Sequence, residues 1–187
     1  NTIDQIIIQS AGNATDFGDL AQAKNGMAST GTPTRAFWLG GYTGGGSPNM
    51  TSQIDTINFA TAGNCSDFGD MSDQRYMMGT AGNDTRICAA GGYASPSFKN
   101  VIDFITIQSK GNGIKFGELL THEGGVGCSN STRGIFAGGY DPSSITNIIS
   151  FITISSFGNA SDFGDLTAVR RGLAGTSSST RAIFAGG

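Results

Sequence analysis

Charged residues are scarce in this chain, and clustered lysines and arginines are absent. Only 13% of the 187 residues are Asp, Glu, Lys or Arg, and the formal net charge is −3. Nucleic-acid binding depends on grouped cations that neutralise phosphates. The composition therefore argues against a nucleic-acid surface, and it leaves proteins or sugars as the expected partners.

Long apolar runs and a paired set of cysteines are also missing. No run approaches the roughly 20 apolar residues of a membrane-spanning helix, so we expect no membrane span. The first residues, NTIDQIII, lack the basic start and cleavage pattern of a signal peptide. The three cysteines, Cys65, Cys88 and Cys128, are odd in number and lie at three different positions of the repeat described next. They are predicted to be buried free thiols and not a disulfide framework.

What the chain has in abundance is glycine, with 30 residues, and a fourfold internal repeat. Three motifs recur in the same order. A strand-like motif starts at residues 3, 54, 102 and 149, which are 51, 48 and 47 residues apart. The second motif follows it and reads GNATDFGDL, GNCSDFGDM, GNGIKFGEL or GNASDFGDL. The third motif reads TRAFWLGG, TRICAAGG, TRGIFAGG or TRAIFAGG. The repeats cover approximately residues 3–53, 54–101, 102–148 and 149–187 of a single domain, 1–187.

Each repeat reads as four short strands separated by Gly, Asn and Ser turns. Ile, Phe and Thr alternate in IDFITIQS and ISFITISS, whereas no segment keeps a 3.6-residue apolar period. The last full cycle predicts strands at 147–154, 162–166, 171–178 and 180–187. A repeated four-stranded unit of about 48 residues is the unit of a β-propeller blade, so we expect an all-β propeller of four blades.

The repeat is circularly shifted along the chain. Residue 3 begins the third strand of a blade, whereas residue 187 ends the second strand. We therefore expect segment 171–187 to pair with segment 3–20 and to close the ring through a split blade, which removes two open sheet edges. The alternative is that the four repeats are part of a larger ring, built from two chains or from a longer parent.

The third motif resembles the blade signature of kelch-type propellers. Its two glycines follow a short apolar strand and are followed by tyrosine, at Tyr42, Tyr93 and Tyr140. The resemblance covers the whole chain. It departs from the kelch pattern where those repeats usually carry a late Trp, because this chain has phenylalanine in the second motif instead. The positions are Phe17, Phe68, Phe116 and Phe163.

The segments IDFITI, GNASDFGDLT and STRAIFAGG resemble a more specific family. They are similar to a divergent kelch-like array in structural proteins of bacteriophages, especially marine phages of cyanobacteria. This resemblance implies a virion protein of the tail, fibre or capsid surface. It implies other virion proteins, or self-assembly, as partners. An extracellular or secreted location is the alternative.

The Asp-Phe-Gly triplet of the second motif has the letters of a kinase magnesium motif. The other kinase motifs are absent, and the third copy has Lys115 in place of the first Asp. Paired aspartates could also ligate calcium, but two carboxylates are too few for a tight site. We favour turn capping by these aspartates. With a single histidine, His122, and scattered cysteines, we expect no catalytic residues, no metal site and no cofactor.

The four Thr-Arg arginines recur more strictly than any other charge. One hypothesis is a ring of cations that faces a central channel and binds an anion. The favoured one is that each arginine pairs with an acid, such as Asp4, Asp55, Asp103 or the aspartates of the second motif. The arginines are Arg35, Arg86, Arg133 and Arg181.

Six Asn-x-Ser/Thr sequences occur, and three of them come from the turn that opens the second motif. Turn chemistry explains them, since Asn tolerates a left-handed backbone and Ser or Thr closes a local hydrogen bond. The asparagines are Asn13, Asn49, Asn64, Asn83, Asn130 and Asn159.

The loops at 42–53, 93–100 and 140–147 vary while their flanking strands do not, so they are the candidate binding elements. Tyr42, Tyr93 and Tyr140 at their starts are predicted to stack on sugar rings or on a partner protein, or else to pack inside the fold. We expect a non-enzymatic structural or adhesion protein. The alternatives are a propeller that recognises a host glycan, and an enzyme, which would need a unique acid, base or metal cluster on one face.

Overall fold

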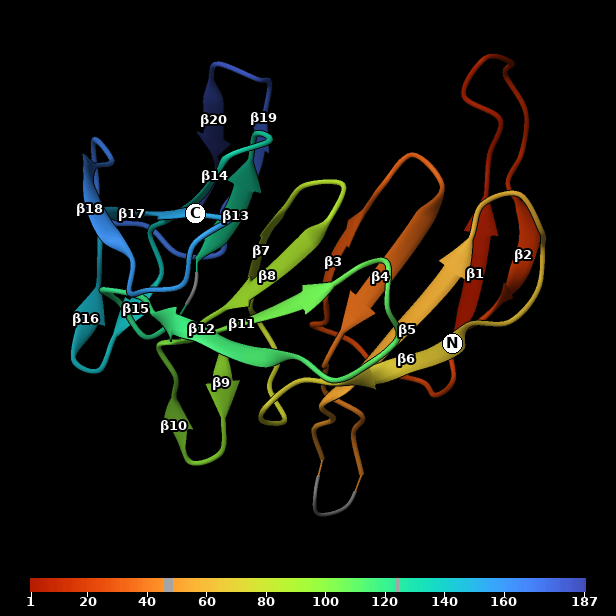
Figure 1. The fold of residues 1–187 in the computed structure, drawn as a ribbon, viewed down its shortest axis with the longest axis horizontal. Coiled ribbons are helices and arrows are strands. Elements are labelled where there is room, and N and C mark those ends of the chain that lie inside the picture. Colours follow the sequence, from red (N-terminus) through yellow and green to blue (C-terminus); the bar gives the residue numbers. More distant parts are fainter. Residues whose placement is uncertain (46–48, 124) are drawn as a thin grey trace.

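The computed structural model describes residues 1–45, 49–123 and 125–187, and its regular secondary structure is entirely β-strand (Figure 1). The all-β prediction is confirmed. Because the described residues form no helix, they contain none that is long and apolar enough to cross a bilayer. Residues 46–48 of the variable loop at 42–53 lie outside the described residues.

Three four-stranded antiparallel sheets make up most of the fold, and we call them sheets A, B and C. Sheet A contains β3 (Ala28–Gly31), β4 (Arg35–Leu39), β5 (Gln53–Asn58) and β6 (Ser66–Asp70). Sheet B contains β7 (Gly79–Gly82), β8 (Arg86–Ala90), β11 (Val101–Thr106) and β12 (Ile114–Glu118). Sheet C contains β13 (Val126–Ser129), β14 (Arg133–Ala137), β17 (Ile148–Thr153) and β18 (Ser161–Asp165).

Two half-sheets flank these three sheets. The N-terminal hairpin pairs β1 (Thr2–Gln5) with β2 (Thr15–Asp19), and the C-terminal hairpin pairs β19 (Ala174–Ser177) with β20 (Ala182–Ala185). By repeat position the N-terminal hairpin corresponds to the third and fourth strands of a complete sheet. The C-terminal hairpin corresponds to the first and second strands. The strands predicted for the last cycle thus lie within one to three residues of β17, β18, β19 and β20.

Sheets A, B and C and the N-terminal hairpin each carry a β-bulge at the Phe-Gly of the second motif. In sheet A, Ile54 pairs with Gly69 and Asp55 pairs with Asp67, so Phe68 is the extra residue of the bulged strand. The same register shift occurs in sheets B and C and in the N-terminal hairpin. A bulge bends its strand and re-aims a side chain. The repeated Phe-Gly is therefore a structural element of the strand pairing.

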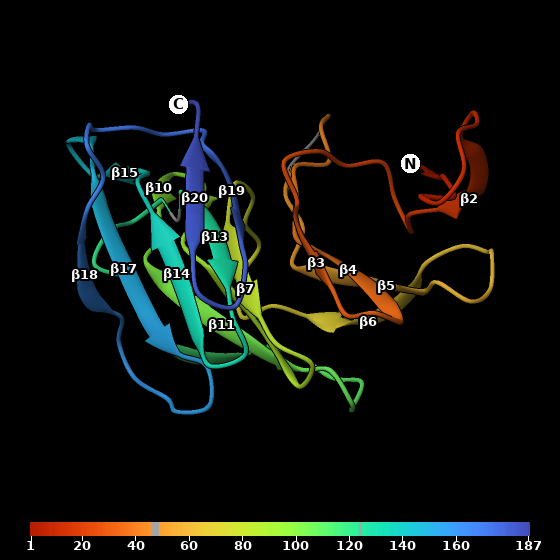
Figure 2. The same ribbon diagram turned by 90° about the horizontal axis from the view of Figure 1, so that it is seen from above.

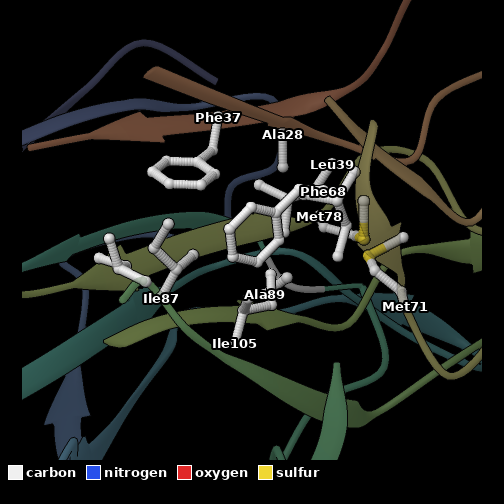
Figure 3. Packing of buried hydrophobic residues seen from close by; sticks show 11 residues of the cluster. Ala28, Phe37, Leu39, Phe68, Met71, Met78, Ile87, Ala89 and Ile105 are labelled. Carbon is white, nitrogen blue, oxygen red and sulfur yellow. The ribbon is translucent and has the colours of Figure 1, made fainter. Parts of the chain in front are cut away.

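The core lies between the faces of successive sheets, and strand alternation supplies it. In β8, Ile87 and Ala89 belong to the cluster shared with sheet A, whereas Cys88 and Ala90 belong to the cluster shared with sheet C. Sheet B is thus buried on both faces, which accounts for its continuous small apolar strand. Figure 3 shows the first cluster, where the ring of Phe68 packs among residues of both sheets.

The predicted split blade is not formed. Within the described residues β1 pairs only with β2, and β20 pairs only with β19. The N-terminal hairpin lies at one end of the long axis, and the C-terminal hairpin lies in the opposite half of the molecule (Figures 1 and 2). The expectation was wrong because it rested on strand order alone. Matching strand order allows the two terminal hairpins to pair, but it does not bring them close together in space. The structure is an open array.

The cysteines are free thiols, as predicted, and Cys88 and Cys128 are buried while Cys65 is half-buried. Burial raises the pKa of the Cys88 thiol to about 12 and that of Cys65 to about 11. Because the thiolate is the reactive form, we expect neither thiol to react at an appreciable rate with a disulfide reagent at pH 8 in the native protein. In denaturant all three should react within the mixing time. Rapid labelling of native Cys88 would contradict the buried position.

Candidate functional site

The second motif makes the same contact at each junction between successive repeats. At the junction of sheets A and B, Gly111 N–H donates to the Phe68 carbonyl at 3.0 Å, and Asn112 Oδ1 accepts from Asp70 N–H at 3.0 Å. The turn of one repeat thus binds the bulge of the repeat before it. Equivalent bonds join Gly63 to Phe17, Asn64 to Asp19, Gly158 to Phe116 and Asn159 to Glu118.

The first aspartate of this motif caps the bulge. The carboxylates of Asp16, Asp67 and Asp162 each accept the backbone N–H two residues later, at 3.0 to 3.1 Å. The expectation of a left-handed backbone at the asparagines of the turns is wrong. Among the described residues, Met77 is the one non-glycine residue with a positive φ. Asn64 and its equivalents use their side chains to bind the neighbouring repeat instead.

The Thr-Arg arginines contact main chain and aromatic rings. Arg35 Nη1 donates to the Ile107 carbonyl at 3.1 Å, and its guanidinium carbon lies 5.3 Å from the centre of the Phe37 ring. Arg86 repeats this contact with the Ile154 carbonyl at 3.0 Å, and Arg133 lies 4.9 Å from the Phe151 ring centre. Arg35 and Arg86 thus tie a sheet to the next one, whereas Asp55 and Asp103, two of the acids expected to bind arginines of this motif, are paired with other cations. Arg181 is exposed.

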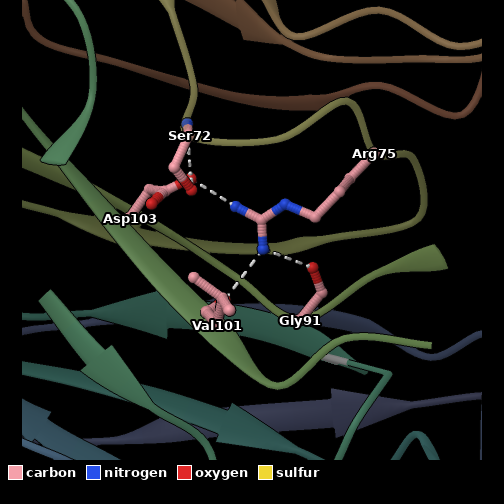
Figure 4. Close-up of polar contacts among 5 residues, drawn as sticks. All are labelled: Ser72, Arg75, Gly91, Val101 and Asp103. Carbon is pink, nitrogen blue, oxygen red and sulfur yellow. Dashed lines mark hydrogen bonds and ion pairs between the residues drawn. The ribbon is translucent and has the colours of Figure 1, made fainter. Parts of the chain in front are cut away.

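Those other cations occupy one repeat position that sequence reasoning missed. Lys24 Nζ lies 3.0 Å from Asp55 Oδ2, and Arg75 Nη2 lies 2.6 Å from Asp103 Oδ2, with all four side chains fully buried. Arg75 Nη1 also donates to the Gly91 and Val101 carbonyls (Figure 4). Burial lowers the pKa of Arg75, and the Asp103 charge opposes that shift. The position was missed because its residue varies, as Lys24, Arg75, Glu123 and Arg170.

The phenylalanines of the second motif lie at the faces between repeats, with one exception. Phe68 is 1% exposed and packs edge-on against Phe37, with ring centres 5.3 Å apart. Phe17 and Phe116 are likewise buried, but Phe163 is 56% exposed. The exception is the copy next to the C-terminal hairpin, which has two strands within the described residues.

The three tyrosines at the starts of the variable loops join one row of aromatic rings. Tyr93 and Phe98 pair across a short hairpin of β9 (Tyr93–Ala94) and β10 (Ser97–Phe98), with ring centres 5.1 Å apart. Tyr140 begins the equivalent hairpin of β15 (Tyr140–Asp141) and β16 (Ser144–Ile145). Neighbouring ring centres are 5.0 to 5.7 Å apart along the whole row. The row runs Tyr42, Tyr76, Tyr93, Phe98, Tyr140.

The row borders a cavity of about 500 Å³. Tyr76, Tyr93 and Phe98 form its aromatic side, and Glu123 and Arg171 supply its charges. Burial raises the pKa of the Glu123 carboxyl, and the charge of Arg171 opposes that shift. Glu123 Oε2 is buried without a hydrogen-bond partner among the described residues, so it is available as an acceptor. An aromatic wall beside a free carboxylate suits a polyhydroxylated ligand or a peptide.

Tyr76 and Phe98 were not found from the sequence, since each occurs in one repeat only. No group of three or more His, Cys, Asp or Glu side chains in the described ranges is placed to hold a metal ion. His122 Nδ1 lies 3.4 Å from Asp141 Oδ1 near the end of the aromatic row. The chain matches no protein-family model, and no curated protein matches its sequence.

Proposed function

We propose that the chain is a non-enzymatic structural or adhesion protein, built as kelch-like blades of a β-propeller, and a component of a virion's tail, fibre or capsid surface. The observation that carries the structural role is the use of the repeated polar groups. The GN turns bind the bulge amides and carbonyls of the preceding sheet or hairpin, and Arg35 and Arg86 each bind a carbonyl of the next sheet. In repeat arrays such nearest-neighbour contacts build a rigid scaffold on which variable loops act.

The virion assignment follows from the sequence resemblance and is tested on particles. Antibodies raised against residues 1–187 are expected to label intact particles of the source virus in immunogold electron micrographs. Labelling confined to host-cell debris, with clean particles, would contradict the virion assignment. Turnover of a substrate by the purified chain would contradict the non-enzymatic one.

The second candidate function is recognition of a host glycan, and the aromatic row favours it. Aromatic rings stack on the apolar faces of sugars, and the Glu123 carboxylate can accept hydroxyl hydrogen bonds beside them. Rings at 5.0 to 5.7 Å form a continuous surface and not isolated side chains.

Replacing Tyr93 with alanine is expected to remove the central ring of the row and to weaken binding to any positive glycan by about tenfold or more. A glycan array followed by titration calorimetry measures this loss. Ser97→Ala is the matched control, because Ser97 is exposed in the same hairpin and is not one of the residues lining the cavity. If the wild-type chain bound no glycan on the glycan array, the glycan-binding function would be rejected and the structural role would remain.

A further inference from the structure

The cavity beside the aromatic row holds two opposite charges that do not satisfy each other. Glu123 and Arg171 are the charged side chains among the described residues that line it. Glu123 Oε2 is buried and has no hydrogen-bond partner among the described residues, Arg171 included. We propose that this cavity binds a zwitterionic group, with a primary ammonium against Glu123 and a phosphate against Arg171. The proposal rests on the glycan-binding function proposed above, and it names the chemical group that the site recognises.

Three aromatic rings form steep walls of the cavity and not a flat platform. The plane of the Tyr93 ring lies at 76° to that of Tyr76 and at 72° to that of Phe98, with ring centres 5.7 and 5.1 Å apart. A sugar ring stacks on one flat aromatic face, whereas walls at steep angles surround a small rounded group. Aromatic faces attract an ammonium through the quadrupole of the ring. The ring geometry therefore favours a cation at this side of the cavity.

The Glu123 carboxylate decides the kind of cation. A buried acceptor without a donor is destabilising, and more so when the acceptor is charged. Burial also raises the pKa of this carboxyl, whereas the charge of Arg171 opposes that shift. A primary ammonium has three N–H donors, so it can donate to Oε2 and place its charge beside the carboxylate. A quaternary ammonium has no N–H donor, and a neutral hydroxyl brings no charge.

The second charge of the cavity disfavours a simple cation. Arg171 lies between β18 and β19, and its guanidinium repels a ligand that has only positive charge. The planar guanidinium instead binds phosphate or carboxylate oxygens. For a group that is attached to a sugar, phosphate is the better match, because a phosphodiester keeps its negative charge and a carboxylic ester does not. The ligand that fits is therefore an aminoalkyl phosphate, of which phosphoethanolamine is a simple form.

The body of the array holds the residues that face the ammonium. Tyr76 precedes β7, Glu123 precedes β13, and the other two rings belong to the β9–β10 hairpin, so all of them lie among the strands of sheets B and C. Tyr76 and Tyr93 exchange two main-chain hydrogen bonds, of 3.2 and 2.9 Å. Glu123 N–H donates to the Tyr140 carbonyl at 2.8 Å. The main chain of the site is thus fixed before a ligand arrives, which reduces the entropy cost of binding.

Four ligands test the parts of the proposal by titration calorimetry on the full chain. Phosphoethanolamine is expected to bind saturably at one site. Ethanolamine lacks the anion, inorganic phosphate lacks the ammonium, and phosphocholine lacks the N–H donors, so each should bind at least about tenfold more weakly. The series uses the wild type and does not depend on how a variant folds. No saturable binding of phosphoethanolamine up to about 10 mM, or phosphocholine binding as tightly, would overturn the proposal.

Two neutral substitutions assign the two ends of the ligand. Glu123→Gln should weaken phosphoethanolamine and ethanolamine alike, by about tenfold or more. Arg171→Gln should weaken phosphoethanolamine but strengthen ethanolamine, because it removes the partner of the phosphate and the repulsion of the ammonium. Asp84→Asn is the matched control, since Asp84 is exposed and does not line the cavity. A Glu123→Gln variant with wild-type affinity for phosphoethanolamine would overturn the proposal.

Two carriers of the group are compared last. Oligosaccharides with and without a phosphoethanolamine substituent test a glycan, and vesicles of phosphatidylcholine with and without an equal part of phosphatidylethanolamine test a lipid headgroup. Selective binding to either substituted carrier supports the proposal and identifies the source. Binding of free phosphoethanolamine with a negative glycan array would reject the glycan-binding function and keep this inference. Binding of unsubstituted glycans that Glu123→Gln leaves unchanged would reject this inference and keep that function.

Discussion

Replacing Arg75 with methionine is expected to lower the free energy of unfolding by about 3 to 5 kcal/mol, because it leaves the Asp103 carboxylate buried without its cation. Both side chains are fully buried, and their atoms lie 2.6 Å apart. The change also frees the carbonyls of Gly91 and Val101, which Arg75 binds. Urea unfolding followed by circular dichroism measures the loss.

The chain contains the matched control for this substitution. Arg170 has the same repeat position, but its one hydrogen bond is at an open edge. Arg170→Met should therefore change the free energy of unfolding by no more than about 0.5 kcal/mol. An Arg75→Met effect as small as this one would contradict the buried ion pair.

A double variant separates the lost attraction from the stranded charge. Glu123 has the repeat position of Arg75, and Ser150 in sheet C has the repeat position of Asp103 in sheet B. Ser150 is 2% exposed without an arginine at that position, so the fold accepts a neutral residue there. Arg75→Met combined with Asp103→Ser should be more stable than Arg75→Met alone. If the double variant were less stable than Arg75→Met alone, the fall in the free energy of unfolding would be due to lost packing and not to the unpaired charge.

The sequence predicted the repeat unit well because its signals are local. Alternating Ile, Phe and Thr, with glycine-rich turns between them, predicted strand 147–154, and β17 spans Ile148–Thr153. Capping by Asp16, Asp67 and Asp162 followed from turn chemistry two residues away. These features depend on few neighbours, so four copies of one pattern were enough to find them.

The ion pairs and the end-to-end arrangement were not predictable in the same way. Strict repetition drew attention to Arg35 and Arg86, whereas the cations that bind Asp55 and Asp103 differ in type from repeat to repeat. Closure depends on the small rotation between successive sheets, summed along the array. No single motif encodes that sum, and the aromatic row likewise needed Tyr76 and Phe98, which do not recur.

Replacing Gly69 with alanine is expected to destabilise the protein by about 3 to 5 kcal/mol, for two additive reasons. Its φ of +150° disfavours any side chain, and the new Cβ would overlap the Gly111 carbonyl of the next repeat. That carbonyl belongs to the turn that binds the Phe68 bulge, so relief requires the junction of sheets A and B to separate. Differential scanning calorimetry should record a matching fall in the unfolding temperature.

Gly164 separates the two reasons, because it has the same place in the repeat and a φ of +135°, yet a Cβ there meets nothing within 4 Å. Gly164→Ala should thus show the backbone strain alone, about 1 kcal/mol. The difference between the variants measures the turn-to-bulge contact in an intact junction. Equal effects of the two variants would mean that strain in the bulge, and not contact between repeats, makes glycine necessary there.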